Sequence, residues 1–127
     1  MTPLSQIKEG RKDLVNKVSL TALARQQLEA ARRASNGRSA GTVVGGHEHV
    51  LRQTMIALLA DRQLSEHENP GEATLHVLQG RVTLIAGTDS WNGSPGDLLI
   101  IPNQRHSLQA EEDSVVLLTV AKYTQNP

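Results

Sequence analysis

The stretch that decides the fold is residues 67–80, which read HENPGEATLHVLQG. Its Asn69-Pro70-Gly71 segment is a run of turn-forming residues, and it breaks the side-chain alternation of any strand that enters it. Beyond the break, Ala73–Leu78 has the composition of a strand, and Gln79-Gly80 supplies a turn after it. The stretch therefore predicts a turn, a strand and a second turn, with His67 at its start.

A second stretch, residues 96–106, has a similar organisation and reads GDLLIIPNQRH. Asn92–Asp97 is a run of turn residues, the apolar strand Leu98–Ile101 follows it, and Pro102 ends the strand. His106 lies just beyond. Each stretch thus combines a turn, a strand and one histidine, and both histidines are candidates for a shared cavity.

Outward from these stretches, the C-terminal two thirds of the chain consist of short strand-like segments separated by Gly, Pro, Asn and Asp. Short strands at regular spacing are typical of an all-β sandwich or barrel. The predicted strands are residues 50–59, 73–78, 81–86, 98–101, 105–110 and 115–121.

The N-terminal part differs. Residues 19–34 have apolar side chains at helical spacing, strong helix formers between them and Ser19 as an N-cap. Residues 35–46 are rich in Gly, Ser and Asn, which indicates a boundary. We therefore expect a helical arm over residues 1–40 and a β-domain over residues 41–127.

Composition narrows the class of protein. The 127 residues suit one domain with a sizeable core, and there is no cysteine for a disulfide, a thiolate metal site or a thiol nucleophile. No apolar run suggests a membrane span or a signal peptide, so we expect a cytoplasmic protein that does not contact a membrane.

The net charge is zero but unevenly distributed. Residues 1–40 carry eight basic and three acidic side chains, whereas residues 41–127 carry five and ten, giving +5 and −5. A basic arm can bind nucleic acid, but no aromatic residue accompanies it for base stacking. Contact of the arm with its own or a partner's acidic β-domain is favoured instead.

Two predicted strands are apolar on both faces, Leu98–Ile101 and Val115–Leu118. A strand with one wet face alternates, so both faces of these strands need a cover. The helix or a second subunit would cover the outer face, and we therefore expect a homodimer.

These motifs resemble those of the cupin family. Gly80 matches the end of the first cupin motif, and Gly96, Pro102 and His106 match the second. The resemblance extends over nearly half of the chain. It implies an all-β double-stranded β-helix, or jelly-roll barrel, preceded here by the helical arm, with a small molecule or a metal ion held in the barrel.

The chain departs from the cupin ligand pattern. His67 falls on the first histidine of the family's metal site, but Asn69 falls on the second and Ala73 on the glutamate. In the second motif Gln104 replaces the usual glycine, and His106 comes one residue early. Two histidines therefore match cleanly, and asparagine is a weak ligand for a transition metal.

Two other residues are candidates to replace the missing ligands. Glu72 would serve as a metal ligand if the chain bulges before it. Two registers of this strand are open: one points the Ala73 face into the barrel, and the other points Glu72 and His76 into it. His49 would serve if the first strand of the barrel begins at His47-Glu48-His49, because histidines two residues apart on a strand share a face.

Three functions follow from the resemblance. The leading hypothesis is a protein that binds a small molecule in a pocket lined by His67, Asn69 and His106. The second is a metal-dependent oxygenase or isomerase, in which His67, His106 and either His49 or Glu72 hold Zn, Fe, Ni or Mn. The third is a regulatory or sensing protein whose basic arm contacts a macromolecule.

Overall fold

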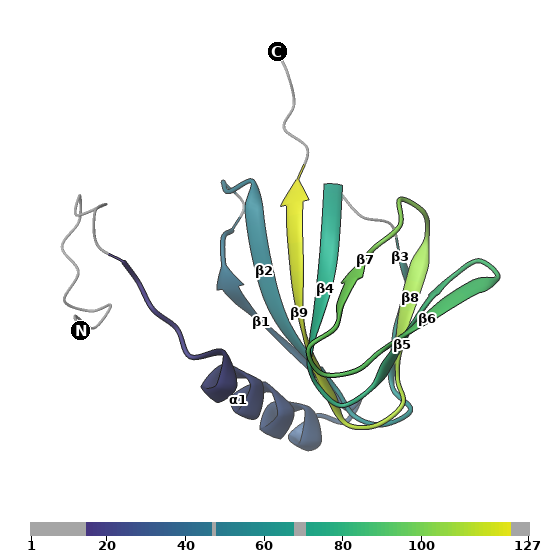
Figure 1. Cartoon of the computed structure of the whole chain (residues 1–127). Helices are drawn as coiled ribbons and strands as arrows, with labels where there is room; N and C mark the ends of the chain where they lie inside the picture. Colours follow the sequence, from purple (N-terminus) through teal and green to yellow (C-terminus); the bar gives the residue numbers. More distant parts are fainter. Residues whose placement is uncertain (1–14, 47, 68–70, 123–127) are drawn as a thin grey trace, which may run out of the picture.

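A computed structural model describes residues 15–46, 48–67 and 71–122, with the backbone alone for Glu66 and His67. This part of the chain contains one helix and nine strands (Figure 1). In chain order they are α1 (Leu20–Arg33), β1 (Arg38–Val44), β2 (Leu51–Leu58), β3 (Gln63–His67), β4 (Gly71–Gln79), β5 (Val82–Ala86), β6 (Asp89–Gly93), β7 (Leu98–Ile100), β8 (His106–Ala110) and β9 (Ser114–Lys122).

The strands form two antiparallel sheets. The larger sheet has the order β1-β2-β9-β4-β7, and the smaller has the order β3-β8-β5-β6. Strands that are neighbours in a sheet are mostly distant in sequence, as a jelly roll requires. Apolar residues of both sheets share one core, so the predicted all-β architecture with an N-terminal helix is confirmed.

Strand β4 shows which faces point into this core. Ala73, Leu75 and Val77 are buried in it, and their partners on β9 are Val120, Leu118 and Val116. Residues paired across antiparallel strands share a face, so the even-numbered residues of β9 also point inward. The register with the Ala73 face inside is confirmed, and the alternative with Glu72 and His76 inside is wrong.

Helix α1 covers part of the outer face of the larger sheet. Its N-cap is Ser19, whose hydroxyl accepts a hydrogen bond from the Ala22 N–H at 3.1 Å, as the sequence predicts. The buried face of the helix, Ala24, Leu28 and Ala31, packs on the outward side chains of β2 and β9. This explains why Val115–Leu118 is apolar on both faces. No helix in the described ranges is long and apolar enough to cross a membrane.

No described element of the protomer covers strand β7 in this way. Its outward side chains, Leu98 and Ile100, are 58% and 78% exposed. They pair with His76 and Thr74 of β4, beyond the area that α1 covers. Within the described residues, the expectation that both faces are covered is therefore met by β9 and not by β7.

Three strands were not predicted from the sequence. Residues 35–46 were interpreted as a boundary, yet β1 occupies most of them and pairs with β2 from Arg38↔Leu58 to Val44↔Gln53. Strands β3 and β6 lie at the edges of the smaller sheet. All three carry Gly, Ser or charged residues, and backbone pairing with a neighbour decides their conformation rather than an apolar face.

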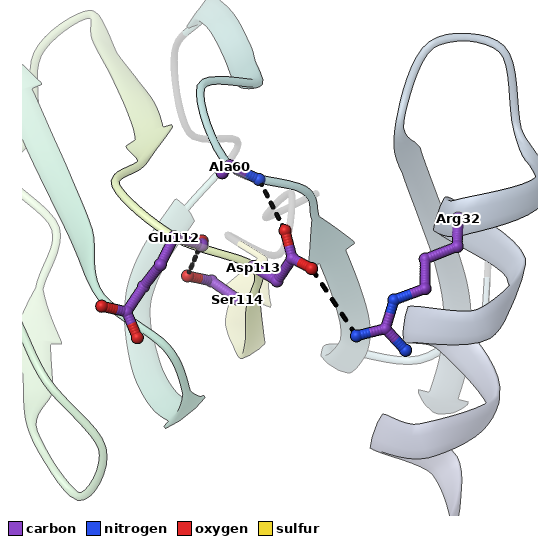
Figure 2. Close-up of polar contacts among 5 residues, drawn as sticks. All are labelled: Arg32, Ala60, Glu112, Asp113 and Ser114. Carbon is purple, nitrogen blue, oxygen red and sulfur yellow. Dashed lines mark hydrogen bonds and ion pairs between the residues drawn. The ribbon is translucent and has the colours of Figure 1, made fainter.

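One end of the barrel, here called the closed end, is tied by polar contacts between its loops (Figure 2). Asp113 accepts a hydrogen bond from the Ala60 N–H at 2.9 Å and lies 3.5 Å from the guanidinium of Arg32 on α1. The buried Ser114 hydroxyl accepts from the Arg81 N–H at 3.0 Å and lies 2.6 Å from the carbonyl oxygen of Glu112. These contacts join the helix and three loops at the closed end.

The backbone conformation at position 80, in the closed end, requires a glycine. Its φ is +82°, a conformation that other L-residues rarely adopt. A Cβ there would lie 2.3 Å from the carbonyl oxygen of Asp113. The glycine that matches the end of the first cupin motif therefore permits both the turn and the close approach of the β8–β9 loop.

Candidate functional site

The opposite end of the barrel is where the two histidine-bearing stretches meet. Strands β2 and β4 begin there and β9 ends there, as the pairing of Leu51 with Ala121 and of Ala121 with Glu72 shows. It lies at the top of Figure 1, above the helix.

Four side chains define what we call the mouth: Arg52, Ala73, His106 and Val120. Val120 pairs with Arg52 on one side and with Ala73 on the other, so these three share the inner face of the larger sheet. His106 begins β8 of the smaller sheet and shares the buried face of that strand with Leu108 and Ala110. The mouth therefore combines residues of both sheets.

His106 is 2% exposed. Its Nδ1 lies 2.9 Å from the carbonyl oxygen of Gln104. A carbonyl oxygen only accepts hydrogen bonds, so Nδ1 carries the proton and donates. In the neutral ring Nε2 is then the acceptor or ligand atom, and the backbone of the β7–β8 loop fixes the tautomer and the ring orientation.

His67 ends β3, and its Cα is the cross-strand partner of that of His106. The two stretches that the sequence singled out are therefore brought together by backbone pairing. The side chain of His67 and the whole of Asn69 lie outside the described residues, so their roles as pocket or metal residues stay predictions.

The two candidate replacement ligands do not join His106. Glu72 is exposed and alternates with the buried Gly71 and Ala73, so its carboxylate lies on the outer face of the sheet. His49 lies in the connection before β2, where it is exposed and donates its N–H to the Gly46 carbonyl at 3.2 Å. The conditions under which Glu72 or His49 would serve, an inward-facing Glu72 and a strand that begins before His49, are therefore not met in the described segments.

The described part of the mouth does not fit a transition metal. The position of the cupin glutamate is occupied by the methyl group of Ala73, which points inward and is 6% exposed. Within the described ranges no three His, Cys, Asp or Glu side chains form a group that could hold a metal ion. The hydrogen bond from His106 Nδ1 to a carbonyl is typical of a metal-bound histidine, but it supplies one ligand of the three that such sites use.

Packing of the inner face changes along the barrel axis. Toward the closed end Ile56, Val116 and Leu108 are buried, whereas toward the mouth Thr54 and Leu118 are partly exposed. A fully filled barrel would bury both levels equally. Solvent therefore reaches part of the inner face at Thr54 and Leu118, whereas Ala73, His106 and Val120 of the mouth are buried and the closed end is packed with apolar side chains.

A separate concavity of about 500 Å³ lies on the outside of the larger sheet. Its outward-facing lining comes from β4, β7 and β9 and contains Thr74, Ile100, Thr119 and Ala121. Because these side chains alternate with the inward residues of their strands, this concavity is on the far side of the sheet from His106. It adjoins the uncovered Leu98 and Ile100.

Arg52 is a site residue that the sequence analysis missed. It lies four and six residues before Ile56 and Leu58 on an uninterrupted strand, and both of these point into the core. Side chains alternate between the two faces of a strand, so Arg52 is assigned to the inner face once Ile56 and Leu58 are known to point inward.

Comparison with solved structures shows the fold. A conserved protein of unknown function from Streptococcus pyogenes superposes with a TM-score of 0.65 and 22% identity, over 72% of this chain and 80% of the other. A cupin superfamily protein from Desulfitobacterium hafniense gives a TM-score of 0.60 and 15% identity, over 67% and 79%. A salicylate 1,2-dioxygenase from Pseudaminobacter salicylatoxidans gives 0.66 and 18%, over 79% of this chain and 33% of the enzyme.

No protein-family profile matches the sequence, and no curated protein is similar to it in sequence. The similarity to cupins is therefore one of structure. The chain has the cupin fold, as its two motifs indicated.

Proposed function

We propose that this cupin-fold protein binds a small organic molecule at the mouth of its barrel, anchored by hydrogen bonds and apolar contact rather than by a transition metal. One observation carries the proposal: the buried, oriented His106 lies at the end of the barrel where the inner face becomes accessible to solvent. Ligand sites are mostly apolar concave surfaces with a few polar groups that fix orientation.

Three features support binding without metal. Ala73 removes the carboxylate that the cupin motif would supply, and Glu72 points away from the barrel. Within the described ranges no three His, Cys, Asp or Glu side chains form a group that could hold a metal ion, and the oriented imidazole of His106 suits a hydrogen bond to a ligand as well as a bond to a metal. A dioxygenase is among the similar structures, but that likeness is one of fold, and fold alone does not carry a reaction.

The test is a fragment screen by ligand-observed NMR on protein dialysed against EDTA, repeated after incubation with Zn, Ni, Fe or Mn. His106→Ala removes the oriented imidazole, and His76→Ala is the control because His76 lies on the outer face of β4. We expect fragments that bind the metal-free wild type and His76→Ala but not His106→Ala. Binding that requires metal, or that His106→Ala leaves intact, contradicts the proposal.

The expected homodimer is part of the same proposal. Leu98 and Ile100 form an exposed apolar strip beside the outer concavity, and the opposite charges of residues 1–40 and 41–127 favour contact between copies. We propose that the dimer contact lies on this strip. We also propose that the protein functions in the reducing cytoplasm. Light scattering should give a dimer for the wild type and a monomer for Ile100→Glu, and a monomeric wild type at micromolar concentration would contradict it.

A further inference from the structure

Arg52 is one of the described cations at the mouth end of the barrel, where Lys122 and Arg105 also lie, and its position follows from strand register. It pairs with Val120, which in turn pairs with Ala73, and both of these partners belong to the barrel core. No bulge interrupts the β2–β9 pairing between Arg52 and Leu58. The side chain of Arg52 therefore leaves the backbone on the inner face.

The described structure assigns Arg52 no structural role. Its guanidinium makes no hydrogen bond or ion pair with any residue in the described ranges. The side chain is nevertheless partly buried rather than extended freely into solvent. Guanidinium groups keep their charge in proteins, and partial desolvation costs them less free energy when an anion is near.

The neighbouring inward residues define the rest of the environment. Below Arg52 on the same strand is Thr54, and across the sheet lie Val120 and Leu118. The opposite sheet contributes His106. A ligand that enters the mouth thus meets a cation and an imidazole at the rim, with aliphatic side chains deeper in the barrel.

We infer that the ligand of this site is a small carboxylic acid with a short apolar body, whose carboxylate is bound by the guanidinium of Arg52. Arginine binds carboxylates through two parallel hydrogen bonds, and this planar geometry fixes the orientation of the acid as well as its charge. The inference rests on the proposed binding function, and it names the class of ligand.

The experiment measures dissociation constants by NMR for matched acids and amides on metal-free, full-length protein. The probes are succinate, benzoate and salicylate, each compared with its primary amide, which has nearly the same shape without the charge. Arg52→Gln removes the charge, Arg52→Lys keeps it without the fork geometry, and Arg81→Gln is the control because Arg81 is exposed at the closed end.

We expect at least one acid to bind about tenfold or more tightly than its amide, since hydrogen bonds to charged groups are the stronger ones. Arg52→Gln should abolish that preference, Arg52→Lys should keep part of it, and Arg81→Gln should leave it unchanged. Far-UV circular dichroism of each variant checks that the fold is retained.

Two results would overturn the inference and separate it from the proposed function. If acids and amides bind equally well, or if Arg52→Gln keeps the preference, the ligand is not selected by charge at Arg52. Binding that still depends on His106 would then leave the proposed function intact. If no acid and no neutral fragment binds, both the inference and the proposed function fail.

Discussion

The two ends of the barrel are built from the same strands and differ in what their side chains do. At the closed end of β2, Leu58 is 1% exposed on the inner face, whereas Leu51 at the other end lies on the outer face, beyond the cover of α1, and is 45% exposed. Polar groups at the closed end are paired, as with Ser114 and Asp113, while Arg52 at the mouth makes no hydrogen bond or ion pair with a described residue. The stabilising polar contacts described above therefore lie at the closed end, and the residues of the proposed binding site lie at the other end.

The largest effect should come from truncating the packed end of β2. Leu58→Ala creates a cavity in the core, and we expect a loss of about 2–5 kcal/mol in the free energy of unfolding. Leu51→Ala, on the same strand, should cost less than about 0.5 kcal/mol because this side chain is already half exposed. Urea denaturation measures both, and equal losses would show that Leu51 is packed as tightly as Leu58.

Gly80→Ala should rank next. The substitution adds a Cβ at positive φ and places it against the Asp113 carbonyl, so we expect a loss of about 2–4 kcal/mol. Gly87 is the control, because its φ is +60° but no atom lies within 4 Å of the added carbon. Gly87→Ala should cost only the backbone strain, about 1 kcal/mol. If thermal denaturation shows equal losses, the close approach at Gly80 contributes nothing.

The polar contacts of the closed end come third. Ser114→Ala leaves the Arg81 N–H without its partner at a buried site, and we expect a loss of about 1–3 kcal/mol. Arg32→Ala breaks an ion pair whose side chains are 54% and 41% exposed, and it should cost less than about 0.5 kcal/mol. A larger effect for Arg32→Ala would mean that the ion pair holds the helix on the sheet (Figure 2).

The smallest effect is expected at the mouth. Arg52→Gln removes no described hydrogen bond or ion pair, so the free energy of unfolding should change by less than about 0.5 kcal/mol while the preference for acids over amides is lost. Denaturation and NMR titration of the same preparation test this separation. A loss above about 1 kcal/mol would instead give Arg52 a structural role.

The sequence placed the main strands well because their side chains alternate or are continuously apolar. The strand predicted at residues 73–78 is β4, and the Ser19 cap and the face of α1 were also correct. The edge strands β1, β3 and β6 were missed, because their residues carry no apolar period and their conformation depends on a neighbouring strand.

The candidate site was predicted in part. The two histidine-bearing stretches do meet, through the Cα pairing of His67 with His106. The face of Glu72 stayed open in the sequence because a turn before a strand removes the parity that would fix it, and the role of His49 stayed open because the start of the strand could not be located. Arg52 was overlooked because one arginine in an apolar segment has no signal until the inner face is known.

By itself the sequence determined the class of fold, the cap and apolar face of the helix, and the two stretches that carry the histidines. These depend on local periods, turn residues and short motifs, which one chain displays directly. Only the tertiary structure decided which face of each strand points inward, and hence that Ala73, Arg52 and His106 meet at the mouth while Glu72 does not. A shift of one residue in strand register moves every side chain of the strand to the opposite face of the sheet. The register is set by pairing between segments that are distant in sequence.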